Sequence, residues 1–253
     1  MQISKSIKNK LYPTATILII VLLWQVIVEI YNVPKYVLPS PLAIIKTLIN
    51  DFELIWSHTK ITIYESFIGF SLAIILAFLL AILMDRFSII KKSIYPILVI
   101  SQTIPTIAIA PLLIIWFGFG MLPKVMVVIL VCFFPIVISL VDGFENIDKD
   151  YMNLFTTFKA SKLQTFYHLK LPFAMVSLFS GLKIAATYMI MSAVIGEWLG
   201  GDKGMGVYMV RSKSAYALDK VFASILVIVL ITISIISIID FIGKRIIHWK
   251  KES

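Results

Sequence analysis

Long uncharged stretches of apolar residues alternate with short polar segments along most of the chain. Five of these stretches are Leu11–Val28, Ser66–Met84, Ser93–Pro123, Val125–Val141 and Val221–Ile239. A sixth, Leu171–Gly196, is interrupted only by Lys183. About 20 apolar residues in a helix cross the hydrocarbon core of a bilayer. The pattern therefore predicts an all-α integral membrane protein with six transmembrane helices, forming a single domain over residues 1–253.

Composition and charge support this prediction and orient the chain. Of its residues, 60% are hydrophobic and 15% charged, which is too apolar for an ordinary soluble domain. With the N-terminus inside, fourteen lysines and arginines fall in cytoplasmic segments and eight in external ones. Both termini are thus expected in the cytoplasm. The apolar run after the basic N-terminus lacks a small-x-small cleavage site, so we expect a retained first helix rather than a signal peptide.

The third stretch has Pro96, Pro105 and Pro111 in its interior and is expected to be kinked and packed inside the bundle. Its last part, Leu112–Phe119, is interpreted as a turn at the far face. Polar groups beside a proline break can line a solute path or can bond neighbouring helices. The candidate path residues in this stretch and in the fifth span are Gln102, Thr103, Pro105, Thr106, Met191 and Ser192.

Several charged residues stand alone within or beside the apolar stretches. Glu197, beside Trp198, is either an interfacial carboxylate or a lining residue of the path, and both residues are kept as path candidates. Glu65 is interpreted as a helix-start acid that complements the dipole. Lys183 is expected to snorkel or to pair within the bundle, and Asp142 and Asp240 to lie at the interface.

The sequence shows neither a Cys/His cluster for a metal site nor a phosphate-binding loop for ATP. Cys132 is the only cysteine, so an internal disulfide is impossible, and His58, His168 and His248 are far apart. A GxxxxGK[ST] phosphate loop is missing, so the chain cannot bind ATP by that route and needs no cofactor of its own. Nucleic acid is not an expected partner, because a basic charge of +9 on so apolar a chain fits loops beside anionic lipid.

Two loops are long. The first, Tyr31–Lys60, is external and contains an amphipathic helix predicted at Leu42–Ile55. The second, residues 145–172, is predicted to be cytoplasmic and contains DKDYMNLFTTFKASKLQTFYHLKLP, in which apolar residues recur at helical spacing. Too polar to span the membrane, it is either an interfacial helix resting on headgroups or a docking helix for a cytoplasmic partner.

This loop resembles one in the permeases of binding-protein-dependent ATP-binding-cassette importers, which has the form EAA, three residues, Gly, nine residues, Ile-x-Leu-Pro. Here Asn153, Leu154 and Phe155 replace the triplet and Lys159 replaces the glycine. The segments LLWQVIVEIYNVPKYVLPSP, SQTIPTIAIAPLLIIWFGFG, FFPIVIS and GEWLGGDKGMGVYM resemble the nitrate/sulfonate/taurine-type permeases, so the likeness extends from Leu22 to about Ile239. The resemblance implies that these residues couple to the ATPase: Asn153, Thr157, Lys159, Ala160, Ser161, Leu169, Leu171 and Pro172.

The resemblance also implies which subunits form the importer and which solute it carries. Two copies of the permease would work in a bacterial cytoplasmic membrane with separate ATPase subunits and an external substrate-binding protein. GEWLGG and TIYESFIGF are more similar to the branch for thiamine-pyrimidine precursors than to the sulfonate branch, so a small heterocycle is the expected solute and taurine, sulfonate or nitrate the alternative. Two other classes remain open here: an integral membrane enzyme and a stand-alone secondary transporter.

Overall fold

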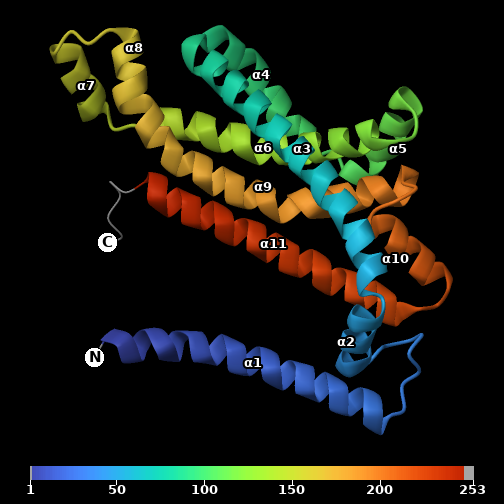
Figure 1. Ribbon diagram of the computed structural model, residues 1–253. Helices are drawn as coiled ribbons and strands as arrows, with labels where there is room; N and C mark the ends of the chain where they lie inside the picture. The colour runs from blue at the N-terminus through green and yellow to red at the C-terminus, as the bar shows by residue number, and fades with distance from the viewer. Residues whose placement is uncertain (1, 248–253) are drawn as a thin grey trace. The chain divides into compact units, whose positions relative to one another are not determined.

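The computed structural model describes residues 2–247, with side chains from residue 11 onward, and every element in that range is helical (Figure 1). His248, Lys250 and Lys251 lie outside the described residues. The helices are α1 Gln2–Ile30, α2 Pro41–Asn50, α3 Phe52–Arg86, α4 Ser88–Ser101, α5 Thr106–Phe117, α6 Met121–Glu145, α7 Lys149–Thr157, α8 Lys162–Thr165, the π-helical turn η1 Phe166–Lys170, α9 Leu171–Gly200, α10 Met205–Ser214 and α11 Leu218–Ile246.

The membrane-spanning pattern agrees with the sequence. Within the described residues, five segments are long and apolar enough to cross a bilayer: α1, α3, α6, Lys162–Gly200 and α11. The pair α4 and α5 meets the same criteria together, but is bent by 103° at its break. The prediction of an all-α membrane fold is therefore confirmed, with five candidate spans, or six if this bent pair crosses the membrane as one broken span.

The chain forms two compact units. The first contains residues up to His58 together with Tyr208–Val227, and the second Thr59–Val207 together with the residues from Ile228 onward. In the first unit, the rings of Trp24 and Phe222 lie 5.7 Å apart, and the Thr47 hydroxyl donates to Asp219 at 2.7 Å. These interactions fasten α1 and α2 to the start of α11.

The core of the second unit is built on α3, α6 and α9, and Figure 1 shows α6 and α9 running side by side. Small residues let these helices approach closely. Ala73, Ala77 and Ala81 recur every fourth residue on one face of α3 and are fully buried. Gly181 of α9 faces α6 so closely that an added Cβ would lie 2.7 Å from the Pro135 carbonyl oxygen. A larger side chain at this position would force α6 and α9 apart.

The proline-rich stretch is broken more sharply than expected. α4 ends at Ser101 and α5 begins at Thr106, because Pro105 has no N–H to donate and its ring restricts the preceding residue. Leu112–Phe119 was predicted as a turn, which is wrong: α5 continues to Phe117, and the turn follows at Gly118–Gly120. The expected packing inside the bundle is also limited in the single chain, where α4 buries Leu98 and α5 buries Ala110 and Leu113.

Both long loops contain helices with different bounds from those predicted. The helix predicted at Leu42–Ile55 is shorter than expected: α2 ends at Asn50 and α3 starts at Phe52. Ser40 caps α2 by accepting from the Ala43 N–H at 3.2 Å, and Pro41 occupies its first turn. The second loop, residues 145–172, forms two short helices, α7 and α8, instead of one.

Candidate solute path and coupling segment

A cavity of about 400 Å³ lies beside the break between α4 and α5, within the range typical of small-molecule sites. It is lined by residues of α4, α5, α6, α9 and the break itself. The lining residues are Ser101, Gln102, Ile104, Thr106, Ile109, Leu130, Val131, Phe134, Pro135, Tyr188, Met191, Ser192 and Ile195. The set is apolar and aromatic with a few hydroxyl groups and one amide.

Four of the predicted path residues line this cavity together: Gln102, Thr106, Met191 and Ser192. The two others in the break, Thr103 and Pro105, are exposed, and the Thr103 hydroxyl donates to the Ile100 carbonyl at 2.7 Å. Sequence reasoning missed Tyr188, which also lines the cavity. Its spacing of three and four residues from Met191 and Ser192 was the available signal, because residues so spaced share a helix face.

Glu197 lies elsewhere, in a buried polar cluster at the end of α9. Its side chain accepts from the Thr62 hydroxyl at 2.7 Å and from the Gly206 N–H at 2.6 Å. The Thr62 oxygen in turn accepts from the Met205 N–H at 2.8 Å. Two N–H groups at the start of α10 are therefore satisfied by side chains of α9 and α3. Gly204 permits this arrangement with a φ of +117°, since a Cβ there would collide with the Glu197 carboxylate.

Glu65 belongs to the same region, and its assignment as a helix-start acid is wrong. It lies well inside α3, is 3% exposed, and forms an ion pair with Lys124, which is also 3% exposed. Lys124 was counted among the external loop lysines, but it lies in the first turn of α6. A charge inside a membrane-spanning helix is normally paired, and this one is.

Trp198 is the remaining path candidate, and the residue is 45% exposed. It lines a separate hollow of about 480 Å³ with Phe119, Gly120, Leu199, Gly200, Gly201 and Asp202. Neither Trp198 nor Glu197 therefore lines the cavity at the α4–α5 break. Lys183 forms an ion pair with Asp240, as one of its two sequence interpretations proposed.

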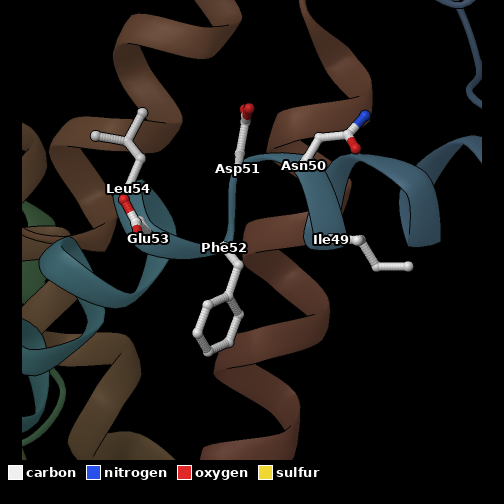
Figure 2. A pocket seen from close by; sticks show the side chains of 6 residues that line it. All are labelled: Ile49, Asn50, Asp51, Phe52, Glu53 and Leu54. Carbon is white, nitrogen blue, oxygen red and sulfur yellow. The ribbon is translucent and has the colours of Figure 1, made fainter.

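A further hollow of about 660 Å³ lies at the corner between α2 and α3, lined by Ile49–Leu54 (Figure 2). Asp51 and Phe52 point in opposite directions there. Asp51 accepts from the Tyr208 hydroxyl at 3.2 Å and pairs with Lys220 at 2.7 Å. Burial, reinforced by the nearby Asp51 carboxylate, raises the pKa of Tyr208, so its phenol remains a donor. We assign this corner a structural role.

The predicted coupling segment, residues 145–172, is helical on both sides of a turn at residues 158–161. Lys159 has a φ of +51°, in the left-handed region that glycine adopts without strain. That conformation accounts for a glycine at this position in the motif the loop resembles. Ser161 caps α8 in a capping box with Gln164, whose side chain accepts from the Ser161 N–H at 2.8 Å.

Side-chain interactions fasten the coupling segment to three long helices. Lys170 pairs with Asp85 of α3 at 2.6 Å. The Phe166 ring lies 5.8 Å from that of Phe144 in α6, and the Tyr151 ring 5.4 Å from that of Phe173 in α9. Force applied to this segment would therefore reach α3, α6 and α9 together.

The eight predicted coupling residues fall into two groups. Asn153, Thr157, Lys159 and Ser161 are exposed and Ala160 is half-buried, so they are accessible to a partner. Leu169 is 3% exposed, and Leu171 and Pro172 are half-buried at the junction with α9. These three join the segment to the long helix and are only partly accessible.

In the part of the chain that the structure describes, no three His, Cys, Asp or Glu side chains are grouped to hold a metal ion. What the site offers is an uncharged cavity between helices and a short helical segment joined mechanically to those helices.

Known proteins with similar sequences are permeases. A "Probable ABC transporter permease protein" of Haemophilus influenzae is 35% identical over 94% of this chain and 97% of its own length. The formylaminopyrimidine transport permease protein ThiX of Halalkalibacterium halodurans is 35% identical over 96% and 97%. The putative aliphatic sulfonates transport permease protein SsuC of Bacillus subtilis is 27% identical over 92% and 85%.

The fold is also similar to a solved one. A structure of the MetNI methionine ABC transporter in an inward-facing conformation matches with a TM-score of 0.58 at 18% identity, over 78% of this chain and 94% of that one. The family model described as "Binding-protein-dependent transport system inner membrane component" matches residues 69–248. The chain belongs to this family: it is a multi-pass membrane permease subunit of an ABC importer, and ATP hydrolysis is the task of a separate subunit.

Proposed function

We propose that this permease moves a small neutral heterocycle of the aminopyrimidine type through the cavity beside the α4–α5 break. The observation that carries the proposal is the lining of that cavity: none of its described lining residues is charged. Phe134 and Tyr188 offer ring faces, and Gln102 offers an amide donor and acceptor. An aromatic heterocycle with ring nitrogens uses both kinds of group. The similarity to ThiX supports the same solute class.

Taurine or another sulfonate is the alternative solute. A fixed anionic group in a membrane-embedded site calls for a cation or several aligned donors to replace its water. The lining residues include Ser101, Thr106 and Ser192 as hydroxyl donors, but Ser192 donates to the Met189 carbonyl at 2.9 Å. The lining therefore favours the heterocycle over the sulfonate.

Uptake by the whole importer tests this choice. The chain is produced with its ATPase subunit and its binding protein, and entry of labelled formylaminopyrimidine is followed. Excess unlabelled aminopyrimidine is expected to block entry, while excess taurine is expected to leave it unchanged. Gln102→Leu should lower uptake at unchanged protein level, whereas Ser237→Ala, on the exposed face of α11, should not. Uptake of taurine in place of the pyrimidine would reject the proposed solute.

We also propose a homodimer with α5 and α9 near the shared axis. On α9, Tyr188, Met191 and Trp198 are 43%, 46% and 45% exposed, and together with Ile195 they follow one helix face. α5 exposes Ile115 and Trp116. A second copy placed against these faces would enclose the cavity between two chains and shield it from lipid.

The coupling segment is proposed to dock on the ATPase subunit through residues 153–161. Ala160, with its small side chain, would permit close approach, and the interactions with α3, α6 and α9 would carry the closing motion into the membrane. The excess of lysine and arginine on this side supports cytoplasmic termini and an inner-membrane location. Reporter fusions at Ser253 and near Asp202 should report opposite sides of the membrane, and a shared side would reject this topology.

A further inference from the structure

A basic groove of about 760 Å³ lies between the coupling segment and the end of α3. It is separate from the cavity assigned to the solute. Its lining residues are Ile82, Asp85, Arg86, Met152, Thr156, Ala160, Lys162, Leu163, Thr165, Phe166, Tyr167 and Lys170. All of them belong to the second compact unit.

The groove has an excess of positive charge. Three cations line it, Arg86, Lys162 and Lys170, against one carboxylate, Asp85. Asp85 is paired with Lys170 at 2.6 Å, so that pair is neutral. Among the described residues, neither Arg86 nor Lys162 forms an ion pair with a carboxylate. Two positive charges therefore face one hollow without compensation.

The position of the groove indicates what could compensate them. It lies where the apolar stretch of α3 ends at Asp85 and Arg86, and beside Lys170, which immediately precedes α9. The ends of two membrane-spanning segments mark the depth of the lipid headgroups. Leu79 and Leu83 are 54% and 45% exposed on the same side of α3 as Arg86, two turns and one turn earlier, respectively. Acyl chains could lie on these leucines while a headgroup phosphate reaches the groove.

We propose that this groove binds the headgroup of an anionic phospholipid, with Arg86 and Lys162 on its phosphate. An arginine offers paired donors to phosphate oxygens and a lysine a mobile point charge. Because the same groove is lined by Ala160 and Thr165, a bound lipid would support the turn that presents the coupling segment. The inference does not depend on which solute the importer carries.

The test is lipid retention by the purified full-length chain in detergent, measured by native mass spectrometry. Phosphatidylglycerol and phosphatidylcholine with identical acyl chains are offered separately. The wild-type chain should retain phosphatidylglycerol about thirtyfold more strongly, which is the combined effect expected of two basic groups near a membrane surface. Arg86→Gln/Lys162→Gln should abolish this preference. Arg86→Lys/Lys162→Arg should keep it, because the charges remain.

A matched control removes the same charge outside the groove. Lys92→Gln/Lys149→Gln alters two exposed lysines, one near the start of α4 and one at the start of α7. Neither lines the groove, so this variant should keep the preference. An unchanged preference in Arg86→Gln/Lys162→Gln would overturn the proposal, as would an equal loss in the control. Displacement of phosphatidylglycerol by millimolar inorganic phosphate would show a free-anion site instead of a lipid site. The proposal would also fail if Arg86→Gln/Lys162→Gln released a copurifying ATPase subunit while lipid retention stayed unchanged. The groove would then be a binding site for that subunit.

Discussion

Replacing Lys124 by methionine should destabilise the protein strongly. Lys124 and Glu65 form an ion pair in which each residue is only 3% exposed, and Glu197, also buried, lies in the same cluster. Methionine has a similar length but no charge, so the Glu65 carboxylate would stay buried without its ammonium partner. Breaking a buried pair from one side costs about 3–5 kcal/mol. One Glu65 oxygen, Oε2, already has no hydrogen-bond partner among the described residues, so little else can compensate.

The magnitude can be measured as a shift of the thermal midpoint of the purified chain in detergent. For a chain of this size 1 kcal/mol corresponds to about 2–4 °C, so Lys124→Met should melt about 6–20 °C below wild type at a fixed scan rate. Lys91→Met supplies the control, because Lys91 pairs with Glu145 at the surface, where side-chain exposures are 26% and 56%. Such a pair contributes about 0–1 kcal/mol, a shift of a few degrees at most.

A second variant separates lost charge from lost packing. Glu65→Leu/Lys124→Met removes both charges and leaves apolar side chains, so it should recover most of the stability that Lys124→Met loses. The reasoning would be refuted if Lys124→Met melted as wild type does. It would also be refuted if the double variant were no more stable than the single one, since the burial of an unpaired carboxylate would then not be the cause.

Three further predictions concern the coupling segment and the assembly. Ala160→Glu should abolish ATP-driven uptake and release the ATPase subunit during purification, at unchanged protein level; normal uptake with the subunit bound would reduce the segment to an interfacial helix. Lys159→Gly should retain uptake and raise stability by up to about 1 kcal/mol in thermal melting, because φ at this position is +51°; a clear loss of stability would contradict the strain argument. Met191→Cys should form a disulfide-linked dimer under mild oxidation, while Val229→Cys on α11 should not, and monomers in both would count against the proposed axis.

The spans could be predicted from sequence because each is longer and more apolar than any soluble helix requires. The segment around Asn153–Pro172 was recognisable as helical for a similar reason, through the spacing of its apolar residues. Its interruption was signalled by the loop motif, in which glycine takes the place of Lys159. The sequence alone does not tell whether a lysine there keeps the left-handed turn, and the structure shows that it does.

Pairings between distant residues could not be predicted in this way. Glu65 and Lys124 are separated along the chain by the rest of α3 and by the bent pair α4–α5, and each alone resembles an ordinary residue at a membrane interface. Their partnership depends on how α3 packs on α6, which residue spacing does not specify. The bend of 103° at Pro105 is similar: proline predicts an interruption, but neighbouring helices determine its angle.

Only part of the candidate path could be predicted, because residue type alone does not show which neighbours a side chain meets in the fold. Gln102, Thr106, Met191 and Ser192 were identified because polar groups near a proline break are natural lining residues, and they do line one cavity. Glu197 was selected for its charge at membrane depth, but its carboxylate accepts bonds from Thr62 and Gly206 inside the fold. Charge at membrane depth thus pointed to Glu197 as an important residue. It did not show whether Glu197 stabilises the fold or lines the solute path.

The most direct test of the account is whether the cavity beside the α4–α5 break changes its accessibility when ATP binds. Met191→Cys, in a Cys132→Ala background, is placed in vesicles with the ATPase subunit and the binding protein, and its modification by a water-soluble thiol reagent added outside is timed. A non-hydrolysable ATP analogue inside should change the rate several-fold, while Val229→Cys, exposed on α11, should show no change. An identical rate at Met191→Cys with and without the analogue would contradict the assignment of this cavity as the solute path.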